Sequence, residues 1–216
     1  AAGARVVKHG NRAATSKSGS ADLLEALGIK IDLTGVEVEQ TVHKIGIGFC
    51  FAPVFHSSMK HAAVARKELG IPTIFNILGP LANPAKPKAC AIGVARAELL
   101  PLMAQVLLDQ GKEGFVFRGD DGLDEVSLST TTQVIQINDG KLTQSVFNPE
   151  DLGITASPIS ELAGGDAVYN AQMTMKIFSG EKGAMRDAVT LNAAFAIAAF
   201  KADFNLPLQT QIANGF

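Results

Sequence analysis

The sequence has few of the residues that build zinc sites and disulfide frameworks. Its 216 residues include two cysteines, Cys50 and Cys90, which lie far apart in apolar surroundings and form no Cys-x-x-Cys pair. Structural zinc sites and disulfide-stapled folds both need more cysteines at closer spacing. We therefore expect two buried thiols in a reducing compartment, in preference to a redox pair.

The sequence also lacks a long apolar run and an excess of positive charge. Its most apolar stretch, residues 193–200, is closed by Lys201 and Asp203 and is far shorter than the roughly 20 residues of a membrane-spanning helix. No secretory leader pattern opens the printed sequence. A net charge of −2 and a pI near 6.1 provide no basic field for nucleic acid. These features predict a cytoplasmic protein without membrane or nucleic-acid partners.

Enough apolar residues remain to form a substantial core. The chain is 47% hydrophobic with a mean hydropathy of +0.19, so we expect residues 1–216 to form one α/β domain. Alternation and turn residues predict strands at 5–8, 49–52, 88–94, 114–118, 131–137 and 141–147, the last two joined as a hairpin through Asn138-Asp139-Gly140. Helices are expected from residue 21 to Gly28, at 35–48, 57–69, 97–109, 167–179 and 184–202, with a long connection over 72–87. Strand, helix and strand over 88–118 form a β-α-β unit, which implies parallel pairing.

One segment near the start combines features that bind phosphate. Lys8-His9-Gly10-Asn11-Arg12 and then Ser16-Lys17-Ser18-Gly19-Ser20-Ala21-Asp22 supply cations, small hydroxyls and glycines before a helix. Such glycines let backbone N–H groups approach an anion. The segment contains neither a P-loop lysine pattern nor Gly-x-Gly-x-x-Gly. Phosphate binding is the favoured interpretation, and an ordinary polar surface loop is the alternative.

The same segment, with two others, resembles anthranilate phosphoribosyltransferases. Lys8-His9-Gly10-Asn11-Arg12-Ala13 followed by Ser18-Gly19-Ser20-Ala21-Asp22 resembles their loop for 5-phosphoribosyl 1-diphosphate (PRPP). Their anthranilate-binding region is similar to Phe51-Ala52-Pro53, His56, Met59-Lys60, Arg66, Leu69-Gly70 and Phe75-Asn76-Ile77-Leu78-Gly79-Pro80-Leu81-Ala82-Asn83-Pro84. Their acidic magnesium motif is similar to Gly119-Asp120-Asp121-Gly122-Leu123-Asp124-Glu125. The three matches occur in order and cover nearly the whole chain.

The resemblance implies a fold and a set of binding residues. The fold is a central, mostly parallel mixed β-sheet flanked by helices, as in nucleoside phosphorylases and phosphoribosyltransferases. The implied PRPP-binding residues are Lys8, His9, Gly10, Asn11, Arg12, Ala13, Ala14, Thr15, Ser16 and Ser20. Those implied for anthranilate are Asn11, His56, Arg66, Gly79 and Pro80. Arg66 would pair its planar guanidinium with the anthranilate carboxylate. Without the resemblance, we would interpret Arg66 as a solvent-exposed charge on a helix.

The resemblance also implies a Mg²⁺ cofactor held by Asp124 and Glu125. Adjacent carboxylates supply the hard oxygen ligands that Mg²⁺ prefers, although acidic turns are common and composition alone would not favour a metal. His43 and His61 match no motif and are expected to be structural or solvent-facing. No residue is assigned as a general base or nucleophile, because positioning and charge neutralisation would suffice for phosphoribosyl transfer.

The implied activity is transfer of phosphoribosyl from PRPP to anthranilate, with release of pyrophosphate, in tryptophan biosynthesis. In the family, a Gly-Thr-Gly-Gly-Asp segment and a helical region that forms much of the homodimer contact precede the Lys-His-Gly-Asn run, and here only residues 1–7 precede it. We therefore expect the 216-residue polypeptide alone to have little activity. Ser57 and Pro72 stand where many relatives carry Pro and Arg, so the resemblance does not define the detailed shape of the aromatic pocket.

Two other functions compete with this interpretation. A pyrimidine nucleoside phosphorylase would share the fold and a related Lys-rich loop, but Asn11 and the run over 75–84 favour the transferase. A non-catalytic relative could use the fold to bind nucleic acid. The acidic balance, with Arg66, Asp124 and Glu125 retained, argues against it.

Overall fold

A computed structural model describes residues 2–13, 16–62, 65, 68–69, 71 and 73–216. The chain forms two compact units. The first contains residues 1–86 and 164–176, and the second contains residues 87–163 and 177–216. The single domain expected over residues 1–216 stays a prediction.

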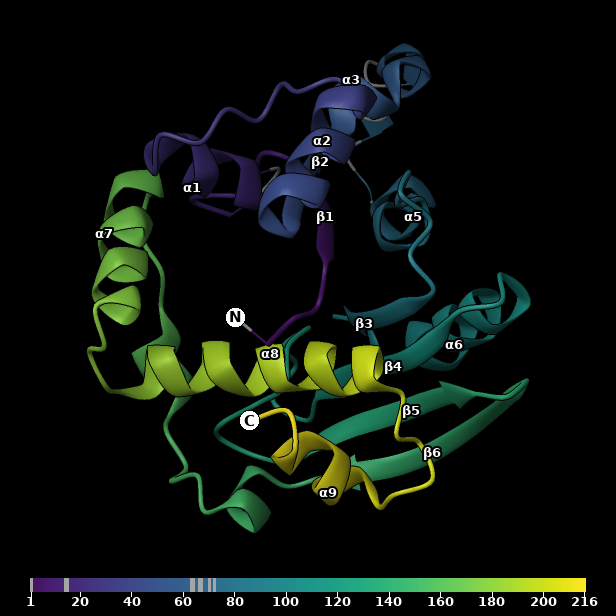
Figure 1. Cartoon of the computed structure of the whole chain (residues 1–216), viewed down its shortest axis with the longest axis vertical. Coiled ribbons are helices and arrows are strands. Elements are labelled where there is room, and N and C mark those ends of the chain that lie inside the picture. The colour runs from purple at the N-terminus through teal and green to yellow at the C-terminus, as the bar shows by residue number, and fades with distance from the viewer. Residues whose placement is uncertain (1, 14–15, 63–64, 66–67, 70, 72) are drawn as a thin grey trace. The chain divides into compact units, whose positions relative to one another are not determined.

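The first unit is built on two parallel strands. β1 (Val6–Gly10) pairs with β2 (Ile47–Phe51) so that His9 lies opposite Cys50. The described helices around them are α1 (Ser20–Ala26), α2 (Gly35–Ile45), α3 (Ala52–Phe55), the 3-10 helix η1 (Ser57–Ala62) and α5 (Phe75–Leu81) (Figure 1). α7 (Ala167–Phe178) begins in this unit.

The ends of α2 follow from its sequence. Thr34 caps the first turn, because its hydroxyl accepts a hydrogen bond from the Glu37 N–H while the Glu37 carboxylate accepts one from the Thr34 N–H. Gly46 ends the helix with a φ of 82°, a left-handed conformation that glycine adopts without steric cost. The helix expected over 35–48 is confirmed, with its end set at Ile45.

The second unit contains a four-stranded mixed sheet in the order β3-β4-β5-β6. The strands are β3 (Ala89–Gly93), β4 (Glu113–Gly119), β5 (Thr132–Asn138) and β6 (Lys141–Phe147). β3 and β4 are parallel and are connected through η2 (Ala97–Leu99) and α6 (Leu100–Asp109), which confirms the β-α-β unit. β5 and β6 form the expected hairpin, and Asp139 and Gly140 both have positive φ, as its tight turn requires.

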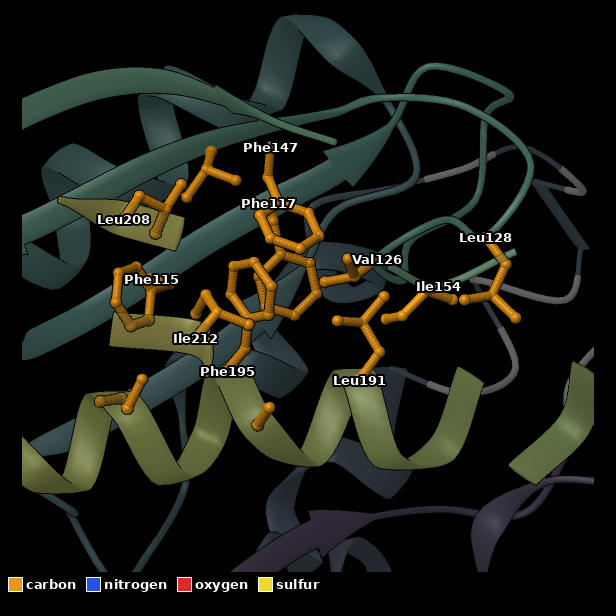
Figure 2. Close-up of a cluster of buried hydrophobic side chains, with 14 of the residues drawn as sticks. Phe115, Phe117, Val126, Leu128, Phe147, Ile154, Leu191, Phe195, Leu208 and Ile212 are labelled. Atoms are coloured by element: carbon orange, nitrogen blue, oxygen red, sulfur yellow. The ribbon is translucent and has the colours of Figure 1, made fainter. Parts of the chain in front are cut away.

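Helices cover both faces of this sheet. α6 packs on β4 and β5, where Val116 and Ile135 are buried, and α8 (Ala184–Lys201) packs on β3 and β4 (Figure 1). Alternate residues of β4 point to the α8 side, so that Phe115 and Phe117 meet Phe195 of α8 (Figure 2). α9 (Leu208–Ala213) adds Leu208 and Ile212 to the same core.

The structure differs from the expected elements at several places. The four-stranded sheet is mixed and flanked by helices, as expected, and one of its three strand pairings is parallel. Residues 57–62 form a 3-10 helix where an α-helix was expected, and the connection expected over 72–87 contains α5. α9 and the 3-10 helices η3 (Pro149–Leu152) and η4 (Ile159–Leu162) were not predicted. Among the described residues, no helix is long and apolar enough to cross a membrane.

Candidate functional site

The first group of predicted site residues lies at the carboxyl end of β1 and in the loop that leads to α1. Lys8, His9 and Gly10 end the strand, and Ser20 begins the helix. A Cβ on Gly10 would lie 2.5 Å from the Ser20 hydroxyl oxygen and 2.8 Å from the Phe49 ring, so a larger residue here would displace both side chains. The loop therefore returns directly onto the strand that it leaves, and Gly10 and Ser20 are neighbours.

Asp22 holds this loop together. Its carboxylate accepts hydrogen bonds from the N–H groups of Ala13 and Gly19, both at 2.9 Å. These hydrogen bonds lower the pKa of Asp22 below its ordinary value. The sequence predicted that backbone N–H groups here would face a phosphate. In this structure, the carboxylate of Asp22 is the anion that binds two of them.

Arg12 is engaged within the same network. Its guanidinium donates hydrogen bonds to Asp22, at 3.0 Å, and to both carboxylate oxygens of Glu25, and it lies 5.5 Å from the centre of the Phe51 ring. The hydrogen bonds of Glu25 and Asp22 raise the pKa of Arg12, and Arg12 in turn lowers the pKa of Glu25. The predicted contact of Arg12 with PRPP stays a prediction, while its observed role is to brace α1.

The predicted PRPP-binding and anthranilate-binding segments meet at two histidines. His9 Nδ1 lies 2.9 Å from the carbonyl oxygen of Gly79, and His56 Nε2 lies 3.1 Å from that of Ala82. The two imidazole rings contact each other edge to face with their centres 4.9 Å apart. Asn83 reinforces the contact by donating a hydrogen bond to the Val7 carbonyl at 3.0 Å. The end of α5 is thereby attached to β1.

These contacts define the protonation of His9. Because a carbonyl oxygen only accepts, Nδ1 of His9 must carry the proton that reaches Gly79. Burial lowers the pKa of His9, and the nearby His56 adds to this effect against the hydrogen bond to Gly79. The favoured form is therefore neutral, with a lone pair on Nε2. That nitrogen is buried and has no hydrogen-bond partner among the described residues.

The remaining predicted residues of this unit differ in their exposure. Lys8, Asn11, Ser16 and Pro80 are exposed, and Gly79 is partly buried. Ala14, Thr15 and Arg66 lie outside the described residues. A cavity of about 340 Å³ is lined by Val7, Gly35, Val38, Glu39, Val42, His43, Cys50, Phe55, Pro84 and Ala85, and no described residue of the predicted site is among them.

The predicted acidic pair lies in the second unit, in the loop between β4 and β5. Asp124 and Glu125 are both exposed, whereas Val126, the next residue, is 1% exposed and belongs to the core. The loop follows the carboxyl end of β4 and contacts the carboxyl end of β3 at Gly93. Ligands of open α/β sheets characteristically bind at this end of parallel strands.

Another carboxylate in this loop, that of Asp121, has a different role. Asp121 accepts hydrogen bonds from the hydroxyls of Ser127, at 2.6 Å, and Ser129, at 2.7 Å, and from the N–H of Leu123 at 3.2 Å. These hydrogen bonds hold the pKa of Asp121 below its ordinary value, against the effect of partial burial. Asp121 therefore shapes the loop through these hydrogen bonds.

The exposed pair fits Mg²⁺ chemically. Mg²⁺ retains several waters and is commonly bound by one or two carboxylates together with substrate phosphates. Among the described residues, no group of three or more His, Cys, Asp or Glu side chains is placed to hold an ion. Asp124 and Glu125 supply two oxygen ligands of this kind, and a phosphorylated ligand would have to supply others.

Sequence reasoning assigned no role to three residues that shape these sites. Asp22 was detectable in principle, since an acidic residue in the first turn of a helix commonly accepts the N–H groups there. The ion pair of Glu25 with Arg12, 13 residues apart, had no local signal. Asn192 of α8 also had none, although its side chain hydrogen bonds to Val126, 66 residues away.

Comparison with known proteins places this chain in a family. The model of the glycosyl transferase family, a/b domain, matches residues 1–211. An anthranilate phosphoribosyltransferase of Rhodococcus jostii (strain RHA1) is 53% identical over 215 residues, which cover 100% of this chain and 59% of the relative. The crystal structure of anthranilate phosphoribosyltransferase from Thermus thermophilus is 40% identical with a TM-score of 0.87, covering 99% of this chain and 63% of that one.

A solved structure with ligands is also similar. The anthranilate phosphoribosyltransferase from Saccharomyces cerevisiae in complex with PRPP and Mg has a TM-score of 0.86 at 29% identity, covering 98% of this chain and 58% of that one. The resemblance seen in the motifs is thus confirmed over the whole chain, which spans about three fifths of the length of the curated relative from Rhodococcus jostii. The chain belongs to the glycosyl transferase family that this a/b domain defines.

Proposed function

We propose that this chain provides the substrate-binding α/β part of an anthranilate phosphoribosyltransferase. The observation that carries the proposal is the contact of His9 with Gly79, which joins the two predicted substrate segments across 70 residues of sequence. The similarity to anthranilate phosphoribosyltransferases over 100% of the chain supports the same substrates. The reaction transfers phosphoribosyl from PRPP to anthranilate and belongs to tryptophan biosynthesis.

In this reaction, the amine nitrogen of anthranilate attacks C1 of the ribose. The C1–N bond forms as the C1–O bond to diphosphate breaks, the leaving diphosphate takes the bonding electrons, and the amine proton passes to solvent. Lys8, Ser16 and Ser20 hold PRPP, and Asn11 reaches both substrates. His56, Gly79 and Pro80 line the aromatic side, and Arg66, which lies outside the described residues, pairs with the carboxylate. The protein contributes alignment of the reactants and no covalent intermediate.

The charge on the departing diphosphate requires compensation. Asp124 and Glu125 would hold Mg²⁺, which when bound neutralises charge on the leaving group. The proposed partners are therefore PRPP, anthranilate and Mg²⁺, with a second copy of the protein in a homodimer. The cytoplasmic location and the low activity of the 216-residue polypeptide stay predictions from the sequence.

Calorimetric titration of the 216-residue chain tests the proposal. We expect PRPP to bind in a Mg²⁺-dependent manner and anthranilate to bind more tightly than its isomer 4-aminobenzoate. Arg66→Ala should weaken anthranilate selectively, and Asp124→Asn with Glu125→Gln should remove the Mg²⁺ dependence of PRPP binding. Binding of thymidine and inorganic phosphate without PRPP or anthranilate would identify a nucleoside phosphorylase. A salt-sensitive affinity for duplex DNA with no binding of either substrate would identify a nucleic-acid-binding relative.

A further inference from the structure

Asn192 of α8 is bound to the backbone of the residue directly after the acidic pair. Its Oδ1 accepts a hydrogen bond from the Val126 N–H at 2.9 Å, and its Nδ2 donates one to the Val126 carbonyl at 3.3 Å. Nδ2 also donates to the Ala188 carbonyl in the preceding turn of α8 at 3.0 Å. Because one planar amide engages both polar backbone groups of Val126, it restricts both the position and the orientation of this residue.

The ends of two parallel strands constrain the acidic pair itself. Gly93 is the last residue of β3, and a Cβ there would lie 1.4 Å from the carbonyl oxygen of Asp124. Gly119 is the last residue of β4, and a Cβ there would lie 3.3 Å from the carbonyl oxygen of Glu125. The backbone of the pair therefore lies directly against the sheet edge, at a distance that a side chain on Gly93 would prevent.

The helix that carries Asn192 is anchored in the core. Leu191 and Phe195 of α8 are both 0% exposed and lie in the same buried cluster as Val126. Figure 2 shows these side chains directed from α8 toward the strands. The Asn192 amide thus connects the buried helix α8 directly to the backbone of Val126, the residue that follows the exposed carboxylates. This direct connection restricts movement of the backbone at Asp124 and Glu125.

We propose that Asn192 is a positioning residue for the metal site, and that Gly93 provides the opposing surface. Together they hold Asp124 and Glu125 as a fixed pair of carboxylates that can share one divalent cation. This inference rests on the proposed Mg²⁺ site. Residues that orient metal ligands commonly change metal affinity by about 10- to 100-fold when they are removed, so an effect of that order is expected for Asn192.

Binding of Mn²⁺ in the presence of saturating PRPP, followed by electron paramagnetic resonance of the free ion, tests the proposal without requiring turnover, because the site is completed by a phosphorylated ligand. Mn²⁺ is a suitable probe because it favours the same carboxylate and water ligands as Mg²⁺. Asn192→Ala should weaken Mn²⁺ binding by about 10-fold or more. Asn192→Asp, which retains an acceptor for the Val126 N–H and loses the donor to its carbonyl, should give an intermediate loss.

A matched control lies on the same helix. The hydroxyl of Thr190 donates to the Arg186 carbonyl at 3.0 Å, so Thr190→Val removes a hydrogen bond within α8 without touching the loop. It should leave Mn²⁺ affinity unchanged. A purely structural role of Asn192 would lower the unfolding temperature without changing Mn²⁺ affinity in the folded chain, and would overturn the proposal.

The outcomes separate this inference from the proposed function. If the wild-type chain binds no Mn²⁺ in the presence of PRPP, or if Asp124→Asn with Glu125→Gln binds it like the wild type, the metal site itself is wrong. If the double variant loses binding while folded Asn192→Ala retains it, the site stands and the positioning role is refuted. Should Asn192→Ala fail to fold, Asn192→Asp decides, and wild-type affinity in that variant refutes the role.

Discussion

Removal of the Phe195 ring should destabilise the second unit more than any surface change. Phe195 is 0% exposed, and its ring centre lies 5.5 Å from that of Phe115, 5.3 Å from Phe117 and 5.2 Å from Phe147. All three pairs are edge to face, an arrangement that contributes about 0.5–1.5 kcal/mol per pair beyond burial. Truncation of a buried Phe to Ala costs about 3–5 kcal/mol. With three ring partners, Phe195→Ala should lie near the upper end of that range.

Native-state hydrogen exchange of the β4 amides measures this loss within the unit concerned, since exchange of core amides reports the free energy of opening. Phe200→Ala is the matched control, because Phe200 lies on the same helix with 51% of its surface exposed. It should cost less than about 1 kcal/mol, as surface substitutions usually do. A loss below about 2 kcal/mol for Phe195→Ala, or one equal to that of Phe200→Ala, would refute the assignment of Phe195 as the centre of this core.

Two further predictions follow from partly buried titratable groups. Burial lowers the pKa of His9 below 6.5, so the unfolded chain binds the proton more readily than the folded chain. The free energy of unfolding should therefore fall as pH drops from 6.5 toward the folded pKa. Urea titrations should show a shallower fall for His9→Asn, whose Nδ2 can still donate to Gly79, and an unchanged slope would contradict the assignment. Burial raises the pKa of Cys90 to about 11, so iodoacetamide at neutral pH should label this thiol slowly in the native chain and readily in urea, whereas rapid native labelling would show that it is accessible.

The elements predicted correctly are those specified by nearby residues. The β5–β6 hairpin depends on Asp139 and Gly140, both of which adopt positive φ in the turn. α5 was missed because Gly79 and Pro80 indicate an irregular segment, and both lie inside the helix. Its last turn is held by a distant contact, the hydrogen bond of His9 to Gly79 across 70 residues, which no local pattern reveals.

The candidate sites divide in the same way. Motifs nominated Lys8, His9 and the acidic pair as candidates, because their order along the chain matches a family. The residues that hold these groups in place were not located, since they act across long sequence separations. Asn192 lies in an Ala-rich helix, and no neighbouring residue indicates its role. Only the structure shows that its amide hydrogen bonds to the backbone of Val126, 66 residues away.

The loop after β1 illustrates how a side chain can change the meaning of a motif. Asp22 already binds the N–H groups of Ala13 and Gly19, and Arg12 is neutralised by Asp22 and Glu25. One cation and two carboxylates leave this network with a charge of −1, which opposes an incoming diphosphate. Under the proposed function, attraction of PRPP would then come from exposed cations such as Lys8 and from bound Mg²⁺. Asp22 therefore stabilises the loop when no substrate is bound, and the N–H groups of Ala13 and Gly19 bind its carboxylate and not a phosphate.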